Sequence, residues 1–162
     1  DAIIDKGIRF DGLFGPAYKG IPLASSVAMA FAETDQDYPL SFNRKEVKTH
    51  GGGGLLLGAP LKGQILAIDD VVTAGTAVRE SFKFIANHGA TLSSFCVAVD
   101  RQERGQEGSG CALSELADIF NLTPISIVTL DDILAFTIDD QRFASDVAPR
   151  IDEYRSQYGA LI

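Results

Sequence analysis

The fold class is decided by residues 64–77, which read Gln64-Ile65-Leu66-Ala67-Ile68-Asp69-Asp70-Val71-Val72-Thr73-Ala74-Gly75-Thr76-Ala77. Residues 65–68 are apolar throughout, as in a strand whose two faces are both buried in a parallel sheet. Two adjacent carboxylates, Asp69 and Asp70, follow at the end of this strand, and a turn of small residues leads into a helix expected over 74–88. Because open α/β sheets bind ligands at the carboxyl ends of their strands, we expect a site at this edge.

Strand and helix patterns alternate along the rest of the chain. Strands are expected at 10–14, 40–42, 64–68, 92–99 and 125–129, and helices at 2–5, 21–33, 74–88 and 114–121. This alternation predicts an α/β protein with a largely parallel central sheet and helices on both faces. Residues 45–62 are expected to be irregular because they contain four consecutive glycines, and 143–158 is compatible with a further helix.

The composition is that of one globular domain spanning residues 1–162, with 46% hydrophobic and 22% charged residues. The net charge of −8 argues against general binding to nucleic acids or anionic membranes, because the field of the molecule repels both. The sequence has no apolar run of the roughly 18 residues that a membrane-spanning helix needs. Two cysteines, Cys96 and Cys111, are too few for a disulfide framework, which favours a cytoplasmic protein.

A small basic island interrupts this acidic chain between residues 42 and 64. Its only acid is Glu46, and its basic residues are Arg44, Lys45, Lys48, His50 and Lys62. The glycine run from Gly51 to Gly54 lies beside this island and suits a mobile lid that closes over a ligand. A solvated basic loop or a flexible hairpin tip is the alternative interpretation.

The turn after the acid pair has the chemistry of a phosphate site. Residues 73–76 offer successive backbone N–H groups at a helix N-terminus, and Gly75 permits unusual backbone angles. Asp69 and Asp70 could accept hydrogen bonds from two vicinal hydroxyls or hold a hydrated Mg²⁺. Capping of the following helix is the alternative role for the acid pair taken alone. The combination of strand, acid pair, turn and helix favours a site for ribose 5-phosphate.

Residues 65–79 resemble the phosphoribosyl pyrophosphate (PRPP) signature of the type I phosphoribosyltransferases. Four further segments are similar to orotate phosphoribosyltransferases of the bacterial type: 13–20 (LFGPAYKG), 42–46 (FNRKE), 48–51 (KTHG) and 100–104 (DRQER). The resemblance implies the type I phosphoribosyltransferase fold with a flexible lid loop. It also implies a transferase that joins orotate to PRPP, releasing pyrophosphate and forming orotidine 5′-monophosphate in pyrimidine biosynthesis, with Mg²⁺ carried by PRPP.

The same resemblance assigns roles to residues. It implies catalysis by Lys48, His50, Asp69 and Asp70. PRPP would be bound by Tyr18, Lys19, Arg44, Lys45, Lys48, His50, Asp69, Asp70, Val71, Val72, Thr73, Ala74, Gly75, Thr76 and Ala77. Orotate would be bound by Thr73 and by Arg101, whose guanidinium can pair with the carboxylate through two hydrogen bonds. The alternatives are simple packing for Tyr18 and a surface ion pair with Glu103 for Arg101.

The resemblance also implies a homodimer in which Lys48 and His50, on the lid, complete the site of the neighbouring subunit. Two departures from the family accompany it. The glycine run lacks the acid that the family's lid commonly carries, and the family's N-terminal segment, with a lysine and aromatic residues that help to bind substrates, has no counterpart here. We therefore expect the chain to be a fragment that, taken alone, turns over orotate weakly or not at all.

Two other functions use the same PRPP site. One is transfer to a purine base, against which Arg101 argues because purines have no carboxylate for it to pair with. The other is a PRPP-binding regulator of RNA or DNA, against which the net charge of −8 argues.

Overall fold

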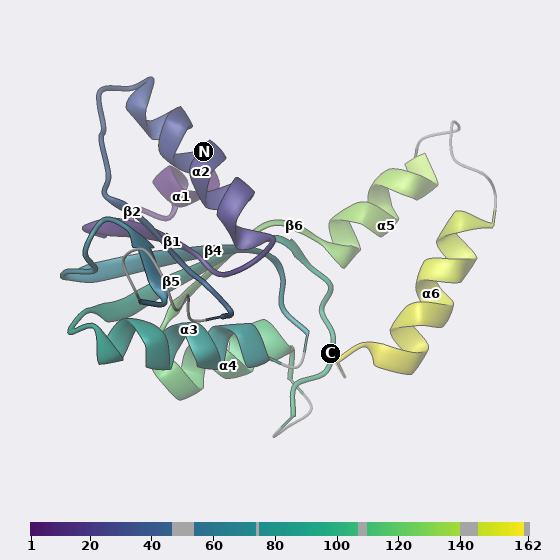
Figure 1. The fold of residues 1–162 in the computed structure, drawn as a ribbon. Helices are drawn as coiled ribbons and strands as arrows, with labels where there is room; N and C mark the ends of the chain where they lie inside the picture. Colours follow the sequence, from purple (N-terminus) through teal and green to yellow (C-terminus); the bar gives the residue numbers. More distant parts are fainter. Residues whose placement is uncertain (47–53, 74, 107–109, 140–145, 161–162) are drawn as a thin grey trace.

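The computed structural model describes residues 1–46, 54–73, 75–106, 110–139 and 146–160, and its centre is a six-stranded sheet in the order β3-β2-β1-β4-β5-β6 (Figure 1). The strands are β1 Gly12–Gly15, β2 Leu40–Asn43, β3 Leu56–Gly58, β4 Gln64–Val71, β5 Thr91–Asp100 and β6 Thr123–Thr129. Neighbouring strands run parallel except for β2 and β3, which are antiparallel. The predicted, largely parallel sheet is therefore confirmed.

Helices cover both faces of this sheet, as the alternating pattern predicts. They are α1 Ala2–Asp5, α2 Gly20–Ala32, α3 Thr76–Asn87, α4 Ala112–Phe120, α5 Leu130–Asp139 and α6 Val147–Tyr158. Figure 1 shows α1 and α2 on one face of the sheet and α3 and α4 on the other. None of the helices in the described part of the chain is long and apolar enough to cross a lipid bilayer.

Alternate residues of β4 enter two separate apolar layers. Leu66 and Ile68 belong to the layer that also holds residues of α1 and α2, whereas Ile65 and Ala67 belong to the layer shared with α3 and α4. All four side chains are less than 5% exposed. Burial of apolar surface on both faces is the main stabilising contribution to such a sheet, so β4 is held firmly and its carboxyl end has a fixed position.

The helices α5 and α6 form a pair that extends away from the sheet beyond β6 (Figure 1). Leu130, at the start of α5, is buried, but α6 has no buried residue. This pair is consequently held by polar contacts and partial burial, which distinguishes it from α1 to α4.

The start of α5 was not predicted, although the sequence carries a signal for it. The main-chain N–H of Thr129 donates to Asp132 Oδ2 at 2.8 Å, and the main-chain N–H of Asp132 donates to Thr129 Oγ1 at 3.1 Å. These reciprocal bonds are a capping box, and hydrogen bonds from Thr129 lower the pKa of Asp132. The pattern Thr-x-x-Asp before an apolar stretch would have predicted a helix directly after β6.

Several predicted boundaries are wrong, and three of them lie within residues 45–88. The expected irregular region 45–62 contains β3, which forms because Leu57 and Gly58 pair with Phe42 and Ser41 of β2. The strand β4 continues to Val71, so the two carboxylates belong to the strand and do not follow it. The helix α3 begins at Thr76, two residues later than expected.

Candidate functional site

The carboxyl ends of β1, β2 and β4 lie around a hollow of about 310 Å³. Residues from all three strand ends line it, and most belong to the turn between β4 and α3. The lining residues are Ala17, Lys45, Val71, Val72, Thr73, Gly75, Thr76, Ala77, Val78 and Glu80. Seven of the fifteen residues predicted to bind PRPP therefore border one concave surface at the predicted edge of the sheet.

The turn between β4 and α3 depends on Gly75. This residue is the N-cap of α3 and has φ +76°, a left-handed conformation that favours glycine. A Cβ atom here would lie 2.6 Å from Leu116 Cδ1. In the part of the chain that the structure describes, no side chain caps α3, so the capping role considered for Asp69 and Asp70 is wrong, and the main-chain N–H groups of the first turn can serve an anion.

The two carboxylates of β4 are in different electrostatic states. Asp69 is 8% exposed, and its Oδ1 accepts the main-chain N–H of Asp70 at 2.9 Å. Burial, and then the neighbouring charge of Asp70, raise the pKa of Asp69 to about 6. Burial is also the largest single effect on the pKa of Asp70 and raises it, but hydrogen bonds from Lys19 and from the main chain of Val71, with the charge of Lys19, together outweigh burial and the pKa of Asp70 is lowered.

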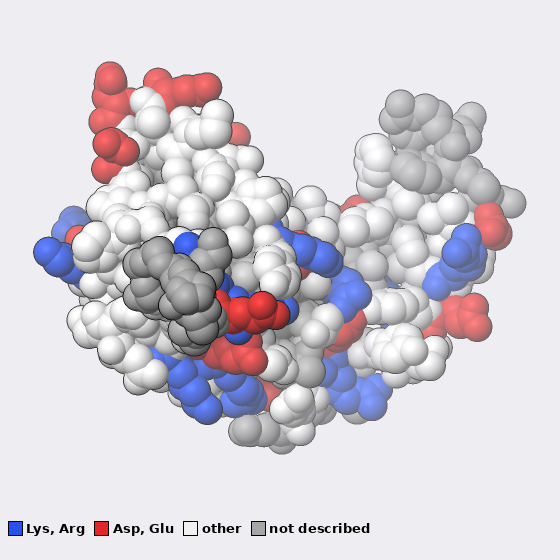
Figure 2. Space-filling model, viewed as in Figure 1, with Lys and Arg blue, Asp and Glu red and all other residues white. Residues whose placement is uncertain are grey.

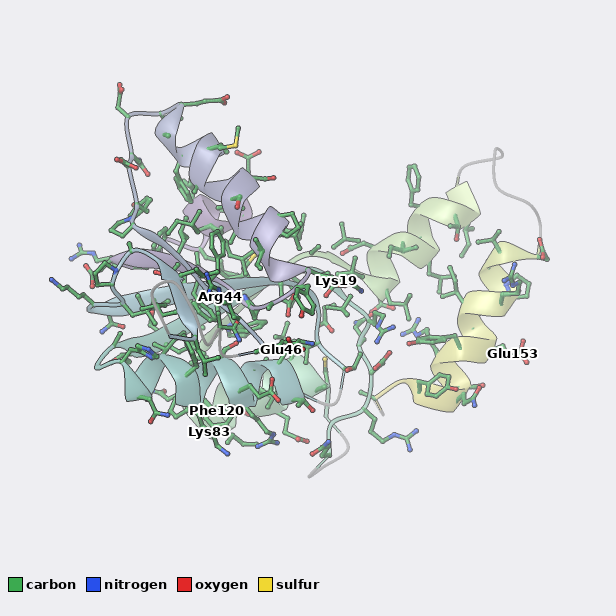
Figure 3. All side chains as sticks on the ribbon, in the orientation of Figure 1. Lys19, Arg44, Glu46, Lys83, Phe120 and Glu153 are labelled. Carbon is green, nitrogen blue, oxygen red and sulfur yellow. The ribbon has the colours of Figure 1, made fainter. Side chains whose placement is uncertain are left out.

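The turn after β1 brings two further predicted residues to this edge. Lys19 Nζ lies 2.6 Å from Asp70 Oδ2, and this hydrogen bond raises the pKa of Lys19. Figure 3 shows Lys19 at the start of α2, on the side from which α5 and α6 extend. Tyr18 is 65% exposed, so simple packing does not explain it, and Lys45 Nζ lies 5.1 Å from the centre of its ring.

The two predicted arginines lie after β2 and β5. In the part of the chain that the structure describes, Arg44 Nη1 is buried without a hydrogen-bond partner, as is Arg101 Nε. Arg101 Nη2 forms an ion pair with Glu103 Oε1 at 2.9 Å, the alternative that the sequence left open. Arg101 also lies close enough to Lys19 for its charge to act on that amine, lowering its pKa against the larger effect of Asp70. Arg101 thus has a local partner and lies near Lys19, the partner of Asp70.

Sequence reasoning missed two side chains at this edge. Asn43, at the end of β2, accepts the main-chain N–H of Ala17 through its Oδ1 at 2.7 Å and so ties the turn after β1 to the neighbouring strand. Glu80, one helical turn after Thr76, lines the hollow. An amide residue ending a strand is a weak signal, and nothing in the sequence marked Glu80.

The predicted Lys48, His50 and Ala74 lie outside the described residues, as does most of the expected lid. Among the residues that are described, no group of three or more His, Cys, Asp or Glu side chains is arranged to hold a metal ion. Asp69 and Asp70 remain as a pair of oxygen donors of the kind that Mg²⁺ prefers, one of them engaged by Lys19. This pair suits a metal ion that arrives with most of its ligands on another molecule.

Comparison with known proteins agrees with this geometry. Residues 2–121 match the phosphoribosyl transferase domain family. The chain is 50% identical over 159 residues to the orotate phosphoribosyltransferase of Pseudomonas syringae pv. tomato, covering 98% of this chain and 74% of that one. It is 51% identical over 158 residues to the orotate phosphoribosyltransferase of Laribacter hongkongensis, covering 98% and 73%.

A solved structure supports the same relationship. The crystal structure of the Francisella tularensis orotate phosphoribosyltransferase superposes with a TM-score of 0.79 at 31% sequence identity, covering 97% of this chain and 74% of that one. The fold class predicted from residues 64–77 is thereby confirmed. The chain therefore belongs to the orotate phosphoribosyltransferases, a family of transferases built on the type I phosphoribosyltransferase fold.

Proposed function

We propose that this chain carries the site at which the phosphoribosyl group of PRPP is transferred to orotate, in a Mg²⁺-dependent reaction of pyrimidine biosynthesis. The bond between ribose C1 and the pyrophosphate oxygen breaks, and its electron pair leaves with pyrophosphate. A ring nitrogen of orotate forms the new bond to C1, giving orotidine 5′-monophosphate. The single observation that carries the proposal is the convergence of segments after β1, β2 and β4 on one hollow.

The turn between β4 and α3 supports the binding of the 5′-phosphate. Main-chain N–H groups at the start of a helix favour an anion, and Thr73 and Thr76 are exposed beside Gly75 and can add hydroxyl donors. Asp69 and Asp70 lie at the start of this turn, where carboxylates can accept hydrogen bonds from the two ribose hydroxyls. The order of residues 69–77 along the chain thus follows the order of groups along ribose 5-phosphate.

The basic residues support the binding of pyrophosphate. Lys19 is held on Asp70, and Lys45 lies over Tyr18, so both amines stand at the same edge as the acid pair. Negative charge builds on the leaving group as the C1–O bond breaks, and cations placed there in advance stabilise it. Mg²⁺ carried by PRPP would add charge neutralisation on the leaving group, and Asp69 and Asp70 would supply carboxylate oxygens to hold it.

Arg101 supports orotate as the acceptor. Its guanidinium follows β5, lies near Lys19, and can pair with a carboxylate through two hydrogen bonds. A purine base offers no such group. Membership of the orotate phosphoribosyltransferases favours the same acceptor over the purine and regulator alternatives. A cytoplasmic location agrees with Cys96 and Cys111 being free thiols.

The test uses the protein expressed from its complete gene, assayed with PRPP and Mg²⁺ by the loss of orotate absorbance. We expect orotate to be consumed, purine bases to be left unchanged, and Lys48→Ala to lower kcat steeply. Lys62→Ala is the matched control, because Lys62 is exposed and lies just before β4, at the opposite end of that strand. Consumption of a purine in place of orotate would overturn the assignment of Arg101.

We assign Lys48 and His50 to the site of the neighbouring subunit in a homodimer, following the family resemblance. A mixture of Lys48→Ala and Arg101→Ala proteins tests this assignment, because a mixed dimer combines both defects in one site and leaves the other site intact. Random exchange of subunits should restore about one quarter of the active sites. If the mixture is no more active than its separate components, the lid serves its own subunit.

A further inference from the structure

Residues 102–104, between β5 and α4, are held by the helix pair α5–α6. Gln102 Nε2 donates to Asp131 Oδ2 at 2.7 Å, and Gln102 Oε1 accepts the main-chain N–H of Asp131 at 2.9 Å. Asp131 Oδ1 also pairs with Arg155 Nη2 of α6 at 2.8 Å. The main-chain N–H of Arg104 donates to the carbonyl oxygen of Tyr158 at 2.9 Å. This segment, which directly follows Arg101, therefore has partners on both helices.

One side chain of α6 continues this contact to Arg101. The hydroxyl group of Tyr154 donates to Glu103 Oε1, the same oxygen that pairs with Arg101 Nη2 at 2.9 Å. Glu103 is 15% exposed and Arg101 33% exposed, so the ion pair is largely shielded from solvent. Burial and the hydrogen bond to Glu103 raise the pKa of Tyr154, which keeps the hydroxyl proton available as a donor.

We propose that Tyr154 and Glu103 are positioning residues for Arg101, so that the α5–α6 pair sets the orientation of the guanidinium that receives the carboxylate of the acceptor. This inference rests on the proposed function, which gives Arg101 that role. Neither Tyr154 nor Glu103 touches the substrate in this arrangement. They act through Arg101 alone.

The chemistry of arginine explains why such a partner is needed. An arginine side chain has much rotational freedom, and a planar guanidinium recognises a carboxylate well only when its plane is already aligned. Glu103 fixes Nη2, and the Tyr154 hydroxyl in turn fixes Glu103, which would otherwise be able to rotate on its own segment. Among the described residues, Arg101 Nε has no hydrogen-bond partner, so this donor is left for a second carboxylate.

The position of Arg101 agrees with this role. Arg101 pairs with Glu103, which Tyr154 of α6 also contacts, and its charge affects the pKa values of both Lys19 and Tyr154, so it lies near the partner of Asp70 as well as the helix pair. Figure 2 shows basic side chains gathered where the surface is notched between the sheet and α5–α6. The helix pair thus borders the same region of the molecule as the proposed pyrophosphate contacts.

The experiment compares Tyr154→Phe and Glu103→Gln with the wild-type protein in steady-state assays that vary orotate and PRPP separately. We expect the KM for orotate to rise roughly five- to tenfold, the loss typical of one hydrogen bond, while the KM for PRPP changes less than about twofold. The double variant should be no worse than Glu103→Gln alone, because Tyr154 acts through Glu103. Should Glu103→Gln fail to fold, Tyr154→Phe carries the test by itself.

Two controls lie on the same helix. Tyr158→Phe removes the hydroxyl of the tyrosine whose ring packs 5.0 Å from that of Tyr154, and Glu153→Gln changes an exposed acid that points away from the sheet (Figure 3). Both should leave the two KM values unchanged. The inference is overturned if Tyr154→Phe leaves the KM for orotate unchanged, if both KM values rise together, or if the two substitutions add.

The same assays separate this inference from the proposed function. If the wild-type protein binds PRPP but releases no pyrophosphate with orotate, the proposed function fails and the inference falls with it. If the wild-type protein is active with orotate and Tyr154→Phe behaves as wild type, only the positioning role is wrong.

Discussion

The two sides of the proposed site are held in place by different physical means. On one side, β4 is buried in both apolar layers of the core, and the turn that follows it packs Gly75 against the buried Leu116. On the other side, the segment that follows Arg101 is held by hydrogen bonds and ion pairs from α5 and α6, and α6 has no buried residue. One side is fixed by the core and the other by polar contacts at the surface.

This difference suits what the two sides are proposed to bind. A phosphate cradle made of main-chain N–H groups needs a rigid turn, because each donor must point at the same place. A side chain that recognises the acceptor needs orientation more than rigidity of its backbone, and polar partners provide orientation. The α5–α6 side is also expected to have the lower local stability, because buried apolar contacts contribute more to stability than exposed polar ones.

Gly75→Ala is expected to destabilise the core-held side of the site and to have the largest effect. The new Cβ would meet Leu116 at 2.6 Å and would require φ +76° of a residue that disfavours it, so we expect a loss of about 2–4 kcal/mol in the free energy of unfolding. Urea denaturation measures this loss. Gly89→Ala is the matched control, because Gly89 has φ +78° with nothing within 4 Å, and it should cost only about 1 kcal/mol. Equal losses would mean that the contact with Leu116 contributes nothing.

Asp69→Asn tests the acid pair through its dependence on pH. The folded-state pKa of Asp69 is raised to about 6 from 3.8, so its contribution to stability is fully present below pH 4 and is lost as the pH rises through 6. The neutral amide avoids that loss, so the variant should be about 2–3 kcal/mol more stable than wild type at pH 7.5, with the difference vanishing near pH 4. Urea denaturation across this range checks it. A difference that is independent of pH would contradict the raised pKa.

The core-held side could be predicted from sequence because its elements follow one another directly along the chain. Residues 64–77 contain the strand, the acids, the turn and the start of the helix, and the predicted edge location agrees with the structure. Only the boundaries were wrong, because pairing with β5 extends β4 as far as Val71. The two covered faces follow from the alternation of strand and helix patterns, whereas the order of the strands was not predicted.

The polar side could not be predicted because its partners are far apart in the chain. Glu103 and Tyr154 are separated by 51 positions, and Gln102 and Asp131 by 29. No periodicity or spacing rule connects such pairs, and each residue alone is an ordinary surface residue. The sequence supplied Glu103 only as a competing partner for Arg101, whereas the structure shows it holding Arg101 and Tyr154 together.

Asp131→Ala tests whether the polar side of the site opens independently of β4. It removes the acceptor for Gln102 and the partner of Arg155, contacts that are partly exposed, so the expected cost is about 1 kcal/mol in the free energy of unfolding. Hydrogen exchange should show faster opening confined to α5, α6 and residues 102–104, with β4 unaffected. Asp146→Ala is the control, because its pair with Arg150 at 3.8 Å is highly exposed and lies within α6 and its N-cap. Opening that spreads into β4 would mean that the two sides are not independent.

Lys19→Met should have the smallest effect on stability and yet affect binding. The Lys19 side chain is 76% exposed, so its pair with Asp70 is screened by water, and the thermal unfolding midpoint should not change measurably. Without the amine, the pKa of Asp70 should rise, because the hydrogen bond and the charge of Lys19 no longer oppose the effect of burial. The KM for PRPP should increase several-fold if Lys19 exchanges Asp70 for pyrophosphate, since one charge-assisted contact is lost. Lys6→Met, at the C-cap of α1, is the control with an exposed lysine outside the site. A clear loss of stability without a change in KM would make Lys19 a structural residue and leave pyrophosphate to the basic residues that follow β2.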